Sequence, residues 1–520
     1  MPGATAFVGG RVFTGDRLCA ALLVEGGIVS VAGSEAEVRR AAPTGTEVRL
    51  LGGALVLPGL IDAHLHLAEI TRRRDGLDLS GAASLEALAT MIRTWADAHP
   101  GPAVVGRGFD PERWPGAAWP TREDLDRMAG GRPVVLVHAS GHAWVVGSPV
   151  LAAAGVDRST PDPPSGRFGR SPDGAPDGRV LEAAIPFLEA RLPDWESVEP
   201  AAMLRTLRST AALGLTTLGA MSVRPDEAVV LRQLVDSGVW PGRVRIYLRG
   251  DRWREYFRDP GGPSGPPGRF EVVGVKAFTD GAFGPRTALL SEPYTDAPDT
   301  TGIEVGTSAE LTALVREASR AGLAPALHAI GDRAVLRALD VVRGLVRPRG
   351  RPPRIEHAAL TPPSLWPRLD EVRPALVVQP GFVWSDRWLT ARLGADRARW
   401  AYAFRSLLDR GHVLAGSSDA PYDPIDPWRG LQAAVRRTDP TGASANPDPS
   451  EAVDAATAVR LYTVHGGLAL GEPRLGRLEP GSAADLVVVR APTLEAAIAA
   501  GASIVLESWV AGEPIRSDPA

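Results

Sequence analysis

Hydrophobic and polar positions alternate in short runs at both ends of the chain. Residues 1–54 contain "TAFVGGRVFTG" and "ALLVEGGIVSVAG", and after residue 470 similar runs return in "ADLVVVRAP" and "SIVLESWVAGEPIR". Alternation with a period of two is typical of half-buried strands, and the glycine pairs between the runs suit hairpin turns. Because both segments flank the rest of the chain, we expect residues 1–54 and 470–520 to form one small β-sandwich.

The middle of the chain, residues 55–469, has a different pattern, in which short apolar runs alternate with helical stretches such as residues 308–321, 332–346 and 395–410. This alternation indicates parallel βα repeats, and eight repeats close naturally into a barrel. The predicted fold class is therefore α/β, a (β/α)8 TIM barrel with the terminal β-sandwich and an inserted cap. The eight strand candidates are "ALVLPGLIDAH", "PVVLVHAS", "GLTTLGA", "VVGVKAF", "LAPALHAI", "PRIEHAA", "PALVVQP" and "HVLAGSSD".

Two connections within the barrel segment are too long for simple loops. They span residues 68–132, which hold a helical pattern near residues 84–99, and residues 141–205. Connections of this length without structure of their own are uncommon in compact domains. We expect them to form the cap over the carboxyl ends of the barrel strands, where the active site of a TIM barrel lies.

The overall composition favours a globular protein that acts on a small molecule. The 57 Lys and Arg residues are balanced by 61 Asp and Glu residues, which gives a net charge of -4 and a pI near 6.2. This balance leaves no basic surplus for nucleic acid or anionic lipid. We therefore expect a small-molecule substrate, no nucleic acid and no membrane partner, while a homodimer stays open.

The sequence carries no sign of export. No window approaches 18 uninterrupted apolar residues, and the N-terminus lacks a basic segment followed by an apolar one. Cys19 is the only cysteine, which excludes an internal disulfide and fits a reducing compartment. The predicted location is cytoplasmic.

Histidines gather at the carboxyl ends of the predicted strands. The first strand ends in "DAHLH", where His64 and His66 stand two apart and can project from the same face of a strand. Of the nine histidines in the chain, His328 and His357 end the fifth and sixth strands. Because strand ends converge on the active face of a barrel, this distribution indicates a metal site, although an isolated His-x-His also occurs in ordinary turns.

Lys276, in "VVGVKAFTDG", is the only lysine among the 57 Lys and Arg residues. It ends the fourth predicted strand, and Asp419 ends the eighth. Every other basic residue of the Lys and Arg set is arginine. A position that keeps lysine therefore indicates a requirement that a guanidinium cannot meet, such as the ability to become a neutral amine. The other interpretation is a buried ion pair, with Asp280 as the partner.

These residues lie in motifs that together resemble the amidohydrolase superfamily, and more closely its amidohydrolase 3 branch of N-acyl and formamide hydrolases. The motifs are "LPGLIDAHLHL", "GHAWVVGS", "VKAFTDGAFGPRTALLSEPYTD", "HAIGDRAV", "RIEHAAL", "GSSDAPYDPIDP" and "GRLEPGSAADLVVV". The resemblance covers nearly the whole chain. It implies two divalent metal ions, of zinc type, bridged by Lys276 after its carboxylation by CO2. The implied ligands are His64, His66, Lys276, His328, His357 and Asp419.

The reaction that the resemblance implies is hydrolysis of a C–N bond other than a peptide bond, in an N-acyl, N-formyl, cyclic amide or carbamate substrate. A carbamate on Lys276 has two oxygens that can span two cations roughly 3.5 to 4 Å apart. A metal-bound hydroxide is expected to attack the carbonyl carbon, with Asp419 as general base and acid. His142 is a candidate donor to the developing oxyanion. Both also have structural interpretations, Asp419 as a turn or N-cap residue and His142 as a packing residue.

Four further residues are candidates for substrate contacts. Arg286 and Asp280 follow Lys276, and they either meet a substrate carboxylate or brace their own loop. Trp384 and Trp388 follow the seventh strand, and they either line an apolar pocket or pack in the core.

The sequence departs from the family pattern at three positions. Met221 follows the predicted third strand where relatives often carry His-Asp, His138 stands where another polar residue is usual, and Gly147 replaces a common asparagine. All three lie near the expected substrate side. The departures therefore bear on the choice of substrate more than on metal binding.

Other functions remain open. A mononuclear deaminase of the same superfamily would carry a glutamate three residues after the strand-five histidine, whereas Ala329, Ile330 and Gly331 follow His328. A catalytically inactive, metal-binding regulatory protein is a second alternative, since a preserved barrel does not guarantee turnover. A metal-free sugar-binding barrel would leave the histidines unexplained.

Overall fold

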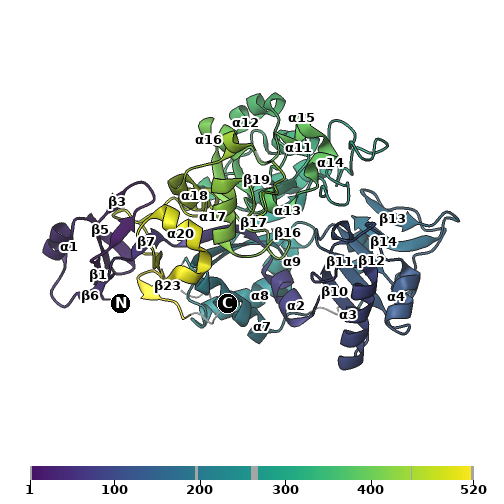
Figure 1. The fold of residues 1–520 in the computed structure, drawn as a ribbon, viewed down its shortest axis with the longest axis horizontal. Helices are drawn as coiled ribbons and strands as arrows, with labels where there is room; N and C mark the ends of the chain where they lie inside the picture. Colours follow the sequence, from purple (N-terminus) through teal and green to yellow (C-terminus); the bar gives the residue numbers. More distant parts are fainter. Residues whose placement is uncertain (1–2, 194–196, 259–267, 447, 517–520) are drawn as a thin grey trace.

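A parallel sheet that is nearly closed into a barrel forms the centre of the molecule (Figure 1). The computed structural model describes residues 3–193, 197–258, 268–446 and 448–516. Within them, the eight strands of this sheet are β8 (Leu60–Leu65), β15 (Leu215–Val223), β16 (Arg243–Arg249), β17 (Phe270–Phe278), β18 (Ala324–Ala329), β19 (Arg354–His357), β20 (Ala375–Val378) and β21 (Val413–Gly416). Neighbours run parallel and follow chain order. After β21, the N–H of Asp419 donates to the carbonyl of His64 at 2.8 Å, so the two edges of the sheet meet. The predicted α/β barrel is confirmed.

One of the eight predicted barrel strands is wrong. The run "PVVLVHAS" forms β11 (Val134–His138) in a separate sheet, and the barrel strand missing from the prediction is β16. Its sequence, RVRIYLR, alternates arginine with apolar residues, as a solvent-exposed strand would. In the fold Arg243 and Arg245 are buried, because Asp485 pairs with the first at 2.6 Å and Glu472 pairs with the second.

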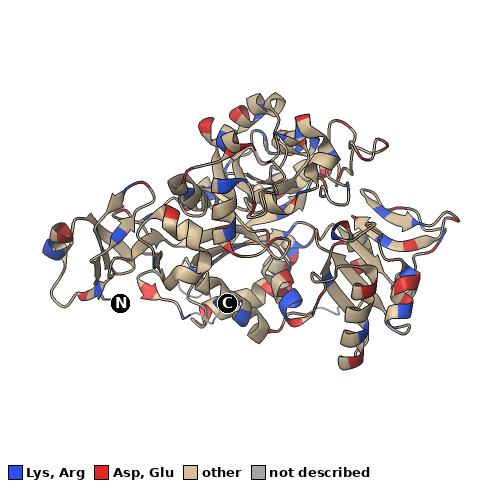
Figure 2. Cartoon of the chain, in the orientation of Figure 1, with Lys and Arg blue, Asp and Glu red and all other residues tan. Residues whose placement is uncertain are grey.

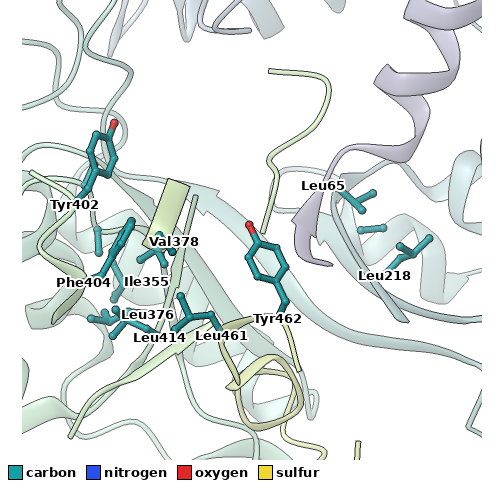
Figure 3. Close-up of a cluster of buried hydrophobic side chains, with 14 of the residues drawn as sticks. Leu65, Leu218, Ile355, Leu376, Val378, Tyr402, Phe404, Leu414, Leu461 and Tyr462 are labelled. Atoms are coloured by element: carbon teal, nitrogen blue, oxygen red, sulfur yellow. The ribbon is translucent and has the colours of Figure 1, made fainter. Parts of the chain in front are cut away.

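Helices cover the outer face of the barrel, and apolar side chains fill the space between the two layers. On β20, Leu376 and Val378 belong to this large cluster, as Figure 3 shows, whereas Ala375 and Val377 pack with small side chains of neighbouring strands. Side chains of alternate residues of the strand thus lie on the two opposite faces of the barrel wall. The helices are α2 (Leu67–Asp75), α7 (Pro200–Ala212), α8 (Pro225–Asp236), α9 (Trp253–Arg258), α10 (Ser308–Arg320), α11 (Asp332–Val342), α12 (Trp366–Val372), α13 (Phe382–Ser385), α14 (Leu389–Leu393), α15 (Ala395–Ala398), α16 (Phe404–Asp409), α17 (Pro427–Arg436), α18 (Ala455–Leu461) and α19 (Val464–Ala469).

A second sheet is inserted between β8 and β15 and lies at the right of Figure 1. Its strands are β9 (Leu77–Asp78), β10 (Val104–Phe109), β11, β12 (Ala143–Val146), β13 (Gly166–Arg170) and β14 (Pro176–Glu182). The helices beside it are α3 (Leu85–Ala98), α4 (Arg122–Met128), α5 (Ser148–Ala153) and α6 (Ala184–Glu189). Apolar residues of α3 and α4 share one buried cluster with the sheet, and those of α5 and α6 share another. Both long connections that the sequence assigns to a cap contribute strands to this sheet, which we call the cap sheet.

Two further sheets pack face to face at the other end of the molecule. The first holds β1 (Thr5–Val8), β4 (Ala21–Glu25), β5 (Ile28–Gly33) and β6 (Glu47–Leu50), with α1 (Glu35–Ala41) beside it. The second holds β2 (Arg11–Phe13), β3 (Leu18–Cys19), β7 (Leu55–Pro58), β22 (Leu486–Val489), β23 (Val505–Val510) and β24 (Glu513–Pro514), with α20 (Leu494–Ala500) between β22 and β23 in the chain. Rings of Phe7 and Trp509, one from each sheet, meet with centroids 5.2 Å apart. Strands from both ends of the chain therefore build this sandwich.

Acidic and basic residues are interspersed over all parts of the molecule (Figure 2). Among the described helices, none combines the length and the apolar character needed to span a lipid bilayer.

Candidate metal centre

The residues predicted as metal ligands meet at the carboxyl ends of the barrel strands. Nε2 of His64 and Nε2 of His66 lie 3.1 and 3.2 Å from Oδ1 of Asp419. The ring of His357 lies 5.0 Å from that of His64 and 4.4 Å from that of His328, measured between centroids. Parallel strands make this possible, because their ends all open on the same rim of the barrel.

Three of these residues form a compact donor set. His64, His357 and Asp419 are buried, and each offers a ligand atom within 4.8 Å of the others. Nδ1 of His64 lies 2.7 Å from Oε2 of Glu356, so its proton is donated there and Nε2 presents a lone pair toward Asp419. Oδ1 of Asp419 is itself buried without a hydrogen-bond partner among the described residues. Facing acceptors of this kind repel one another, and a shared cation relieves the repulsion, so the residues fit a divalent metal.

Hydrogen bonds to one ring nitrogen of each residue fix the orientation of the His357 and His328 rings. Nδ1 of His357 lies 2.8 Å from Oε1 of Gln379, and Nε2 of His328 lies 3.0 Å from the carbonyl oxygen of Gly281. Each bond selects the tautomer that leaves the other ring nitrogen without a proton. Burial also lowers the pKa of His357 to about 3 and holds that of His328 well below its usual range, so both stay neutral as metal binding requires.

Glu356 anchors His64 and is itself held by Arg354. The guanidinium of Arg354 donates to both carboxylate oxygens of Glu356 at 2.8 Å, and all three residues are fully buried. Burial alone would raise the pKa of Glu356, but Arg354 and His64 outweigh it and hold that pKa far below the ordinary value. The sequence motif "RIEH" contains this carboxylate, yet nothing in the sequence links it to a histidine 292 residues away.

Lys276 is buried beside these ligands. Its Nζ lies 3.4 Å from Nε2 of His64 and 4.8 Å from the ring centroid of Phe278. Burial lowers the pKa of its ammonium to about 8, so the neutral amine is accessible near neutral pH. Asp280, the ion-pair partner that the sequence leaves open, is instead buried and accepts backbone N–H groups from Leu289, Ile330 and Gly331.

His142 reaches the centre from the cap sheet. It precedes β12, and its ring centroid lies 4.8 Å from that of His328. Its Nδ1 lies 2.9 Å from Oε2 of Glu182, the last residue of β14. Burial alone would lower the pKa of His142, but the carboxylate of Glu182 outweighs it and raises that pKa. Sequence reasoning missed Glu182, which has no motif of its own and meets His142 only through pairing of β12 with β14.

The centre opens into a cavity of about 450 Å³ between barrel and cap sheet. His66, Lys276, His328, His357 and Asp419 are on its wall, together with His142 and Glu182. Much of the remaining wall is apolar, with Leu67, Val137, Trp144, Met221, Phe278 and Leu314 among its members. Met221 belongs to β15, the second barrel strand and not the third.

Arginines on the cavity wall are paired with carboxylates of the protein. Glu69 pairs with Arg72 at 2.5 Å and with Arg107 at 3.0 Å. Arg224 pairs with Glu227 at 3.2 Å. Each of these three arginines therefore already has a carboxylate partner within the protein.

The four predicted substrate contacts lie elsewhere among the described residues. Arg286 pairs with Asp296 at 2.9 Å, and Trp384 is buried in the large core cluster. Trp388 packs beneath the guanidinium of Arg392, 5.3 Å from it. Asp280 braces its own loop as described above, and none of the four is on the cavity wall. Their role in substrate binding stays a prediction.

Two positions where the sequence departs from the family pattern, His138 and Gly147, belong to the cap. His138 ends β11 with Nδ1 2.8 Å from Oγ of Ser140, and its ring stacks on Trp119 at 5.0 Å. Burial lowers the pKa of His138 to about 3. Gly147 is the N-cap residue of α5.

A parallel barrel whose strand ends gather histidines, a buried lysine and an aspartate defines a metal-dependent hydrolase. The particular family follows from comparison with known proteins. The model of the amidohydrolase family matches residues 47–516, and the chain belongs to this family.

Relatives agree with this assignment over nearly the whole chain. Putative amidohydrolase YtcJ of Bacillus subtilis is 33% identical, covering 92% of this chain and 93% of the relative. N-substituted formamide deformylase of Arthrobacter pascens is 30% identical, covering 92% and 91%. Among solved structures, an uncharacterized metal-dependent hydrolase from Pyrococcus horikoshii superposes with a TM-score of 0.77 at 29% identity, covering 94% of this chain and 98% of the other.

Proposed function

We propose that the chain hydrolyses an amide-like C–N bond of an uncharged small molecule at a centre of two divalent metal ions. The observation that carries the proposal is the gathering of a buried lysine, an aspartate and four histidines at one end of the cavity. Family membership supports hydrolysis, and the name of the formamide-acting relative supports the C–N bond.

The residues that would hold the metals are the six predicted ligands. Lys276 would join them as a carbamate, which its amine forms with CO2 once it has lost its proton, and the pKa of about 8 favours that step. Bound divalent metals supply Lewis acidity and a water of lowered pKa.

Proton transfer falls to Asp419. Burial alone would raise its pKa, but the neighbouring His64 and His66 hold that pKa well below the usual range, so Asp419 enters the reaction as an ionised carboxylate that carries no proton of its own. Its position at the rim lets it take up a proton and pass it to a leaving nitrogen in the cavity. His142, whose pKa is raised by Glu182, can donate a hydrogen bond to the carbonyl oxygen from the opposite side.

The cavity wall favours a neutral substrate with an apolar substituent. Trp144, Met221 and Phe278 offer apolar surface, while Arg72, Arg107 and Arg224 already face carboxylates. A substrate carboxylate would have to compete with those buried partners. We therefore expect N-substituted formamides or neutral amides to be hydrolysed faster than N-acyl amino acids.

Two measurements test the proposal. Elemental analysis of purified protein should find about two zinc-like ions per chain, and one or none would contradict the two-metal centre. Hydrolysis should then be assayed on matched panels of neutral N-alkyl and N-aryl formamides, cyclic amides, carbamates and N-acyl amino acids. Cleavage of esters or deamination without any amide hydrolysis would overturn the assignment of the bond.

A further inference from the structure

The cap sheet places two polar residues side by side above the barrel rim. His142 precedes β12 and Glu182 ends β14, and the register pairs Ala143 with Leu181 in these antiparallel strands. The backbone N–H of Glu182 also donates to the carbonyl of His142 at 3.2 Å. Because both the backbones and the side chains of the two residues are bonded, their relative geometry is fixed by the sheet itself.

Glu182 combines a buried carboxylate with an unfavourable backbone conformation. Its side chain is 4% exposed, and its φ of 51° lies in the left-handed region that residues other than glycine seldom adopt. Strain of this kind persists where the surrounding structure imposes it, and it concentrates at functional sites. The strained backbone aims the carboxylate at Nδ1 of His142, 2.9 Å away.

The second carboxylate oxygen of Glu182 lies against the barrel. Oε1 is buried and lacks a hydrogen-bond partner among the described residues. It lies directly over Gly281, where an added Cβ would approach within 1.9 Å of it. The carbonyl oxygen of Gly281 in turn accepts the N–H of His328 at 3.0 Å. Only a glycine leaves room here, so the cap carboxylate rests on the residue that orients a barrel histidine.

We infer that Glu182 is a positioning residue that acts through His142. Its carboxylate binds the Nδ1 proton of His142 and thereby turns Nε2 toward the cavity, where a substrate carbonyl would be met. The inference rests on the proposed function for the contact of His142 with substrate. The position of the imidazole proton is a property of the protein alone.

The first experiment observes that proton. Zinc-loaded protein with 15N-labelled histidine is compared by NMR with the variants Glu182→Gln, Glu182→Ala and His142→Ala, the last of which assigns the His142 signals. We expect Nδ1 to carry the proton in the wild type and in Glu182→Gln, whose amide oxygen can still accept it, and expect this preference to be lost in Glu182→Ala. An unchanged proton position in Glu182→Ala would overturn the inference.

The second experiment measures turnover on the best neutral formamide. Glu182→Ala and His142→Ala should each lower kcat/KM by about 100-fold, and the double variant should be no worse than His142→Ala, because both changes remove one function. Metal content should stay at the wild-type level. Additive losses in the double variant would show that Glu182 acts independently of His142.

Two controls separate this role from general damage to the cap. Glu123→Gln changes an exposed carboxylate on α4 of the cap and should leave kcat/KM and the histidine spectra unaltered. Glu182→Gln guards against misfolding of the alanine variant. If the wild type hydrolyses no amide, the proposed function fails while the NMR comparison still decides the inference.

Discussion

Glu356 and His64 are joined by a 2.7 Å hydrogen bond inside the barrel, between residues 292 positions apart. The bond sets the tautomer of His64 and leaves its Nε2 for the metal centre. Arg354 holds the other side of the same carboxylate, so the three buried residues form one rigid support.

Replacing Glu356 by Gln should weaken metal binding. The amide cannot accept both bonds from Arg354 and still hold His64, and loss of such a support typically costs 10- to 100-fold in affinity. Titration of the apoprotein with zinc against a competing chelator measures this. Glu371→Gln, at an exposed position on α12, is the matched control. Equal zinc affinities of the wild type and Glu356→Gln would show that the carboxylate of Glu356 does not support metal binding through His64.

Replacing Lys276 by Ala should remove the proposed bridging ligand. We expect at least one metal ion per chain to be lost and activity to fall to the background, with partial recovery when a short carboxylic acid such as propionate is added. Lys276→Arg should not be better than Lys276→Ala, because a guanidinium stays protonated and forms no carbamate. Elemental analysis of the three proteins is the measurement, and full metal content in Lys276→Ala would remove the bridge from the mechanism.

Replacing Gly281 by Ala should disturb the contact between cap and barrel. The new Cβ would lie 1.9 Å from Oε1 of Glu182 and 2.1 Å from Oγ1 of Thr287, so the carboxylate must move away from His142. Overpacking of this kind usually costs about 1 to 3 kcal/mol, and kcat/KM should fall by about tenfold or more. Gly284→Ala is the control in the same loop, because its Cβ would meet Trp388 at an ordinary 3.7 Å. Similar values of kcat/KM in the two variants would show that the contact between Glu182 and Gly281 does not matter for turnover.

His138 should make the free energy of unfolding depend on pH. Burial, with help from the charges of His142 and Arg113, lowers its pKa to about 3 in the folded protein. Above about pH 6.5 the imidazole is neutral in both states and its contribution is complete. As the pH falls below 6.5 only the unfolded chain takes up the proton, so stability is lost progressively toward pH 3.

The matched variant for this effect is His138→Gln, which does not titrate. Whatever its constant cost at pH 7.5, the difference in stability between variant and wild type should shift in favour of the variant by about 2 kcal/mol at pH 5. Thermal unfolding at the two pH values measures the shift. His99→Gln, at an exposed position, should give no such change. A constant difference for His138→Gln would show that the folded protein tolerates the charge.

The gathering of the candidate ligands at the barrel rim could be predicted because each of them follows an apolar run. The chemistry of a parallel barrel depends on strand ends, and His64, Lys276 and Asp419 are read directly from the ends of such runs. The supporting residues could not be predicted in this way. Glu182 meets His142 through the pairing of β12 with β14, and Glu356 meets His64 from a strand that is not its neighbour. A carboxylate by itself gives no sign of which histidine it will meet.

The misassigned strand has a related cause. β11 is an uninterrupted apolar run, as barrel strands are, but it is buried between the two helical layers of the cap sheet. β16 carries three arginines, and burial of Arg243 and Arg245 is possible only because Asp485 and Glu472 arrive from the far end of the chain. The local pattern identifies an apolar run such as β11 as buried, but it cannot tell which core the strand enters. It also cannot tell that a distant carboxylate will pair with an arginine and allow its burial, as in β16.

Strand β7 leads directly into β8, which carries His64, yet one of the two neighbours of β7 in its sheet is β22, which pairs with it over four positions. During synthesis the first barrel strand is therefore made long before β22, the strand that pairs with β7 behind it. Domains generally fold in the order in which they are made, but here the order of synthesis and the order of contact disagree. We therefore expect β7, the strand behind the metal centre, to gain this partner only after every predicted ligand has been made.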